Sequence, residues 1–188
     1  MSRSFAGAGV ALVTPFTRSG DLDEAALRRL VKRQVEGGID VLVPCGTTGE
    51  SATLTAEEQK RVIAISVEEA AGRVPVLAGA GANDTRVAVE KSKAAAALGA
   101  SGILSVGPYY NKPTPEGYYR HFSTIADAVT IPIVVYNVPG RTGSNIDVKT
   151  QLRLAAHPNI TAVKEASGNL GQVMEILRDR PPGFELLS

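Results

Sequence analysis

The stretch ITAVKEAS, residues 160–167, shows most directly how this chain folds. It begins with Ile, Thr, Ala and Val and is bounded by Asn159 and Gly168, a pattern typical of a short buried strand. Lys164 is the exception, because an ammonium group is costly to desolvate unless it is paired or its pKa is lowered. The stretch therefore predicts a buried strand with one residue that needs a chemical explanation.

Runs of the same kind recur along the chain at intervals of roughly 25–35 residues, the length of a β-loop-α-loop unit. Amphipathic stretches at 23–38, 55–72 and 84–99 lie between them and predict helices, the second opening with a Thr-Ala-Glu-Glu capping box. Nearly all-apolar strands, each followed by a helix, indicate a parallel sheet covered by helices. The predicted strands are 9–15, 39–46, 74–81, 102–108, 132–139, 160–167 and 184–188.

Two architectures fit this alternation: a doubly wound open sheet and a (β/α)8 barrel. The residues after the first predicted strand, TPFTRSG (14–20), lack the GxGxxG pattern, which weighs against a dinucleotide-binding open sheet. A (β/α)8 barrel typically takes ~250 residues, whereas this chain of 188 residues ends on or just after its seventh predicted strand. We therefore predict an α/β (β/α)8 TIM barrel truncated after about the seventh strand, with residues 1–188 in a single domain.

Composition narrows the functional class. The chain is 44% hydrophobic and 21% charged, and its net charge of +1 is spread without a basic stripe, which argues against a nucleic-acid partner. Its apolar runs fall short of the ~20 residues that a membrane-spanning helix needs. A single cysteine, Cys45, fits a reducing cytosol, and two separated histidines leave no histidine-based metal cluster. We expect a cytoplasmic protein without metal, cofactor, nucleic acid or membrane.

Polar side chains gather where predicted strands end, which is where a barrel carries its functional groups. GTTGES (46–51) follows the second predicted strand, YNVPGRTG (136–143) closes the fifth, and Lys164 lies near the end of the sixth. Lys164 shares strand parity with Ile160 and Ala162, so its side chain is expected to face the barrel interior. This clustering indicates a site more strongly than any one residue does.

Lys164 has two interpretations. A strand lysine often extends to the rim or pairs with a carboxylate. Alternatively, its amine is a nucleophile that forms a Schiff base with a carbonyl substrate. Burial would then bring its pKa from ~10.4 towards ~7–8.

The neighbouring candidates are equally ambiguous. Tyr136 is either a core residue with its hydroxyl at the surface or a proton shuttle beside Lys164. Arg141 is either a solvated charge or a two-pronged ligand for a substrate carboxylate. Thr47 and Thr48 are either turn residues or groups that hold a small carboxylate or relay a proton.

The stretch PYYNKPTPEGYY, residues 108–119, predicts a long aromatic, Pro-rich loop after the fourth strand. Tyr109 and Tyr110 lie at its tip. Exposed tyrosines at such a position suggest a subunit contact or an active-site lid.

GTTGES, PYYNKPTPEG, YNVPGRTG and VKEASGN, in this order and spacing, resemble the dihydrodipicolinate synthases of the pyruvate-dependent Schiff-base aldolase/lyase family. The resemblance runs from about residue 5 to the last residue. It implies a (β/α)8 barrel that condenses pyruvate with L-aspartate 4-semialdehyde to 4-hydroxy-tetrahydrodipicolinate, in lysine and diaminopimelate biosynthesis. It also implies a homo-oligomer, dimer or tetramer, formed through the Tyr109–Tyr110 loop.

The resemblance also implies roles for individual residues. Lys164 would form the imine with pyruvate. Tyr136, Thr47 and Tyr110 would relay protons, with Tyr110 reaching the neighbouring subunit's site. The substrate-binding residues would be Thr48 for the pyruvate carboxylate, Arg141 for the semialdehyde carboxylate, and Gly46.

Alternatives remain within and outside this family. Another pyruvate-dependent aldolase, acting on sialic acid or 2-keto-3-deoxy sugar acids, is disfavoured by the double threonine and by Arg141. A non-catalytic fragment that serves only as a folding or assembly module is the second alternative. Lysine-inhibited members carry polar ligands where this chain has Ala56 and Gln59, and a glutamate where it has Val87. We therefore expect weak or absent inhibition by lysine.

Overall fold

The structure is a computed structural model that describes residues 5–188. The chain forms two compact units. Unit 1 contains the chain up to Gly79 together with Ala94–Ile103, and unit 2 contains Ala80–Lys93 and Leu104–Ser188. Helix α3 (Thr85–Ala97) begins in unit 2 and ends in unit 1, and strand β4 (Gly102–Val106) begins in unit 1 and ends in unit 2.

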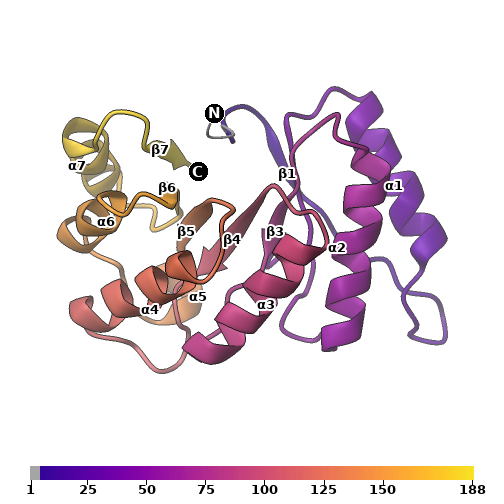
Figure 1. Cartoon of the computed structure of the whole chain (residues 1–188), viewed down its shortest axis with the longest axis horizontal. Coiled ribbons are helices and arrows are strands. Elements are labelled where there is room, and N and C mark those ends of the chain that lie inside the picture. The colour runs from indigo at the N-terminus through magenta and orange to yellow at the C-terminus, as the bar shows by residue number, and fades with distance from the viewer. Residues whose placement is uncertain (1–4) are drawn as a thin grey trace. The chain divides into compact units, whose positions relative to one another are not determined.

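Unit 1 is built from short parallel strands and a pair of helices. Strand β1 pairs with β2 in parallel, with Gly9 opposite Val41, and Leu42 of β2 bridges to Val76 just before β3. Helices α1 and α2 run side by side (Figure 1). The elements are β1 (Gly9–Ala11), α1 (Glu24–Glu36), β2 (Val41–Val43), α2 (Ala56–Ala70) and β3 (Leu77–Gly79).

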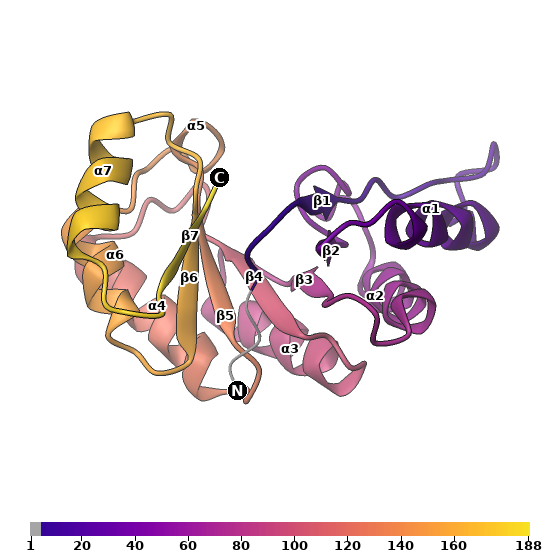
Figure 2. The same cartoon turned by 90° about the horizontal axis from the view of Figure 1, so that it is seen from above.

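Unit 2 contains neighbouring strands in the order β4-β5-β6-β7, of which β5, β6 and β7 pair in parallel. Helices α4, α6 and α7 lie on one side of β5, β6 and β7 (Figure 2). The remaining elements are α4 (Pro115–Asp127), β5 (Ile133–Asn137), α5 (Pro139–Thr142), α6 (Val148–Ala155), β6 (Ile160–Glu165), α7 (Leu170–Asp179) and β7 (Glu185–Leu187).

The predicted alternation of strands and helices and the parallel pairing are confirmed. Helices expected at 23–38, 55–72 and 84–99 appear as α1, α2 and α3, and the capping box is present at Thr55 and Glu58. The strands are shorter than predicted. The second run, for example, stops at Val43, because Pro44 has no N–H to donate and Cys45 has a φ of 55°.

In the described residues, no helix is long and apolar enough to cross a membrane. Nor do three or more histidine, cysteine, aspartate or glutamate side chains of residues 5–188 gather in a group that could hold a metal ion.

Candidate active site

Lys164 and Tyr136 face each other across two neighbouring strands. Their backbones are register partners between β6 and β5, and Lys164 Nζ lies 4.7 Å from the centre of the Tyr136 ring. Tyr136 is buried and Lys164 is half-buried, next to the fully buried Val163. The structure therefore brings the two principal sequence candidates together in one place.

Burial lowers the pKa of the Lys164 amine below its ordinary value of 10.5. Desolvation disfavours the ammonium form, and no ion pair of Lys164 within residues 5–188 offsets it. A larger fraction of neutral amine is consequently present at any pH below that value. The neutral amine is the form of a lysine side chain that can attack a carbonyl carbon to form an imine.

Glu165 is a buried carboxylate beside this pair that was not predicted from the sequence. It follows Lys164 directly, is 3% exposed, and is the register partner of Asn137. Its carboxylate accepts hydrogen bonds from Asn137 Nδ2 at 2.9 Å, Gln151 Nε2 at 2.7 Å and Gln172 Nε2 at 2.9 Å. The available signal was a carboxylate near the end of one predicted strand and an asparagine near the end of the preceding one.

The hydrogen bonds keep Glu165 ionised. Burial raises the pKa of its carboxyl, but the hydrogen bonds that it accepts from side-chain and backbone N–H groups outweigh burial, so the pKa lies below its usual value. A buried negative charge thus lies directly behind the Lys164–Tyr136 pair.

Arg141 is carried by the short helix α5, which follows β5 after a single residue. Thr142 is buried, and its Oγ1 donates to the carbonyl oxygen of Ser144 at 2.8 Å. The turn closes at Gly143, whose φ of 79° suits glycine. With Thr142 turned inward, Arg141 is exposed and able to meet an anion.

The Tyr110 loop is attached to the same turn. The N–H of Tyr110 donates to the carbonyl oxygen of Thr142 at 3.3 Å, and Asn111 Nδ2 donates to the carbonyl oxygen of Asn83 at 2.9 Å. Tyr110 has a φ of 74° and is 90% exposed, and Tyr109 is also exposed. The expected exposure of these tyrosines is confirmed.

A turn of unit 1, separated from the end of β2 by two residues, contains Gly46, Thr47 and Thr48. The N–H of Gly49 donates to the carbonyl oxygen of Gly46 at 3.1 Å, and the Gly49 carbonyl accepts from Thr14 Oγ1 at 2.7 Å. Gly46 is buried, whereas both threonines are exposed. The turn thus presents two hydroxyl groups on a fixed backbone, which suits a carboxylate ligand or a proton relay.

Comparison with known proteins decides the family. The family model described as the dihydrodipicolinate synthetase family matches residues 4–188. The chain belongs to this family. The resemblance drawn from the four sequence motifs is thereby confirmed.

Individual members of the dihydrodipicolinate synthetase family also match this chain over nearly its whole length. A 4-hydroxy-tetrahydrodipicolinate synthase of Chlorobium phaeobacteroides is 56% identical over 100% of this chain and 64% of its own length. One of Chloroherpeton thalassium is 58% identical over 99% of this chain and 62% of its own length. The chain therefore spans just under two thirds of the curated relatives that it matches.

Solved structures of the family give the same result. The dihydrodipicolinate synthase of Aquifex aeolicus matches with a TM-score of 0.95 and 47% identity, over 98% of this chain and 63% of that structure. The 4-hydroxy-tetrahydrodipicolinate synthase of Methylacidiphilum fumariolicum SolV matches with a TM-score of 0.96 and 41% identity, over 98% and 62%. The predicted fold class is confirmed by these matches together with the parallel strands. The expectation that residues 1–188 form a single domain stays a prediction.

Proposed function

We propose that this chain carries out the pyruvate chemistry of a 4-hydroxy-tetrahydrodipicolinate synthase, with Lys164 as the nucleophile. The observation that supports this most is the half-buried Lys164 amine with its lowered pKa, 4.7 Å from the ring of Tyr136. Membership of the dihydrodipicolinate synthetase family supports the choice of pyruvate.

The reaction proceeds through an imine. The neutral Lys164 amine adds to the C2 carbonyl of pyruvate, and loss of water from the adduct gives the protonated imine. Removal of a C3 proton gives an enamine, whose C3 attacks the aldehyde carbon of L-aspartate 4-semialdehyde. The semialdehyde's amino group then attacks C2, which closes the ring and releases Lys164 as the free amine.

The remaining site residues take the roles that the family resemblance implies. Tyr136, Thr47 and Tyr110 relay the protons that the imine and aldehyde steps require. Thr48 and Gly46 bind the pyruvate carboxylate, and Arg141 binds the carboxylate of the semialdehyde. The exposure of Arg141, of both threonines and of Tyr110 supports these roles.

We infer in addition that the protein works as a homo-oligomer in the cytoplasm. The 90% exposure of Tyr110 supports a subunit contact at its loop. Sedimentation of the wild type and of Tyr110→Ala tests this contact, and an unchanged oligomeric state in the variant argues against it.

Borohydride reduction in the presence of pyruvate tests the proposal. Peptide mass spectrometry should place a reduced pyruvate adduct on Lys164, and Lys164→Ala should abolish it. Lys149→Ala, at an exposed lysine of α6, is the matched control and should leave the adduct intact.

Two results would contradict parts of the proposal. A folded chain without an adduct on Lys164 would refute the nucleophile and favour a folding or assembly role. A chain whose unreduced pyruvate enamine condenses with sugar aldehydes in preference to aspartate semialdehyde would refute the second substrate and favour another aldolase of the family.

A further inference from the structure

The ends of β5 and β6 carry two residue pairs in successive register positions. Tyr136 is opposite Lys164, and Asn137 is opposite Glu165. Because successive side chains of a strand point to opposite faces, the second pair lies behind the first. Asn137 and Glu165 are 1% and 3% exposed, so this rear pair is sealed from water.

The Glu165 carboxylate accepts hydrogen bonds from N–H groups of several separate segments of unit 2. One carboxylate oxygen accepts from Asn137 of β5, Gln151 of α6 and Gln172 of α7, at 2.9, 2.7 and 2.9 Å. The other accepts from the backbone N–H of Ser167, which follows β6, at 2.8 Å. All of these donors are neutral amides, so the charge is held by hydrogen bonds alone.

Asn137 extends the cluster to the segment that returns from α5. Its Oδ1 accepts from the N–H of Ile146 at 3.1 Å, and its Nδ2 donates to Asn145 Oδ1 at 2.8 Å. Gln151 Nε2 also donates to the carbonyl oxygen of Ile146 at 2.7 Å. The cluster therefore ties the ends of β5 and β6 to the segment after α5.

Burying a carboxylate without a cation is unfavourable unless its hydrogen bonds are satisfied, and buried charged groups are in general weak contributors to stability. A satisfied buried network, however, fixes the positions of the groups that carry it. Lys164 and Tyr136, at the preceding register position, lie directly in front of this network.

We propose that Glu165 is a positioning residue, which with Asn137 fixes the ends of β5 and β6 so that Tyr136 stays beside the Lys164 amine. The inference rests on the proposed function, because it concerns the amine that attacks pyruvate. Glu165 itself touches no reacting atom.

Glu165→Gln tests the proposal on the 188-residue chain. The substitution keeps the size of the side chain but places an NH2 group among N–H donors, so that buried donors lose their acceptor. The rate of borohydride-trapped adduct formation at saturating pyruvate should fall about tenfold or more, since small displacements of reacting groups are costly. Hydrogen exchange should accelerate in 133–146 and 160–167 but not in 5–79.

Three further variants separate a positioning role from a purely stabilising one. Glu175→Gln makes the same change at an exposed residue of α7 and should behave as the wild type. Gln172→Glu in the Glu165→Gln background returns a carboxylate to the cluster and should restore most of the trapping rate. If Glu165→Gln does not fold, Gln172→Met removes one donor and should trap pyruvate more slowly than Glu175→Gln.

Each outcome decides the proposal. Equal trapping rates in the wild type and Glu165→Gln, or in Gln172→Met and Glu175→Gln, would overturn it and leave the proposed function intact. Faster exchange throughout the chain without rescue by Gln172→Glu would overturn it in favour of a purely structural role. A folded wild type that traps no pyruvate would overturn the proposed function, and this inference with it.

Discussion

Lys164 and Glu165 are adjacent in the sequence, but their surroundings have opposite effects on their charged forms. The Glu165 carboxylate is surrounded by N–H donors, whereas the Lys164 ammonium is half-desolvated without an ion-pair partner among the described residues. Folding therefore stabilises one charge and disfavours the other. Groups that a protein holds in an unfavourable state commonly belong to its functional site.

Replacing Lys164 by methionine should raise stability while abolishing pyruvate trapping. Because the folded-state pKa of Lys164 lies below its unfolded value, the unfolded chain binds more protons, and the penalty shrinks as the pH rises. The gain in melting temperature should therefore be larger at pH 7 than at pH 10. A gain of 1 kcal/mol corresponds to about 2–4 °C in a chain of this size. Calorimetry at the two pH values checks this, and a lower melting temperature for Lys164→Met at pH 7 would contradict it.

His121 should make the chain sensitive to mild acid. It is 4% exposed, and its Nδ1 lies 2.8 Å from Thr85 Oγ1. Burial lowers its pKa from 6.5 to about 4, partly opposed by the charge of Asp84. Since the unfolded chain takes up this proton first, the free energy of unfolding should fall by about 3 kcal/mol as the pH drops from 6.5 to 4.

The measurement is urea unfolding at both pH values. His121→Gln, which keeps a polar partner for Thr85 and gains no charge, should lose most of this dependence. His157→Gln is the control and should retain it, so an equal acid response in both variants would show that another group is responsible.

Lys164 and Tyr136 could be predicted from the sequence, whereas the buried residues behind them could not. Lys164 and Tyr136 were recognisable because a polar side chain at the end of an apolar strand stands out locally. Glu165 was not, because its side-chain donors lie 28, 14 and 7 residues away and meet it only after folding. Tyr110 was recognisable only as an exposed aromatic residue, and a catalytic role for it is implied by the family resemblance alone.

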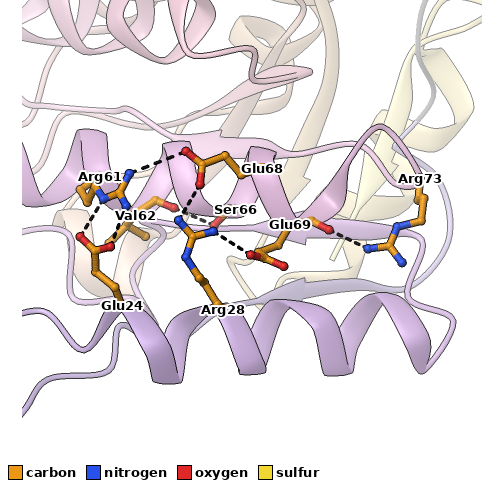
Figure 3. Close-up of polar contacts among 8 residues, drawn as sticks. All are labelled: Glu24, Arg28, Arg61, Val62, Ser66, Glu68, Glu69 and Arg73. Carbon is orange, nitrogen blue, oxygen red and sulfur yellow. Dashed lines mark hydrogen bonds and ion pairs between the residues drawn. The ribbon is translucent and has the colours of Figure 1, made fainter.

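At the scale of elements, helices α1 and α2 pack together and are joined by ion pairs between their side chains. Arg61 of α2 holds both carboxylate oxygens of Glu24, and Arg28 of α1 reaches Glu68 and Glu69 (Figure 3). The helices were predictable from apolar spacing and capping signals, whereas these cross-helix pairs depend on how the helices pack. The side chains of Arg61 and Glu24 are 41% and 43% exposed, so their attraction is weakened by water.

The capping box of α2 should contribute more to stability than a hydroxyl group that is hydrogen-bonded within a helix. Thr55 Oγ1 accepts from the Glu58 N–H at 3.2 Å, and Glu58 accepts from the Thr55 N–H at 2.8 Å. Thr55→Ala should lower the free energy of unfolding by about 1 kcal/mol. Thr124→Ala, which removes only a hydroxyl bonded to the Arg120 carbonyl within α4, should cost clearly less. Equal urea midpoints for the two variants would contradict this ranking.

At the scale of the whole molecule, charge and exposed apolar surface favour self-association. The net charge is +1, and Leu170, Met174 and Leu177 of α7 are 74%, 69% and 44% exposed. Their spacing of four and three residues places them on one face of the helix. Little electrostatic repulsion therefore opposes contact between such faces.

Light scattering should show association that rises with protein concentration and falls in Met174→Glu. Glu175→Gln, the neighbouring exposed position, should not reduce it. A wild type that scatters as one species at all concentrations, or an unchanged Met174→Glu, would contradict the expectation.

The chain enters each compact unit more than once, because 94–103 belongs to the unit formed by the chain up to 79, while 80–93 belongs to the other. Cleavage between 79 and 80 would therefore yield two fragments that remain interlocked, since the second fragment supplies part of the first fragment's own unit. Neither unit can be produced from one uninterrupted stretch of coding sequence. The two units should therefore be studied by recombining complementary fragments, and not by expressing each unit as a separate domain.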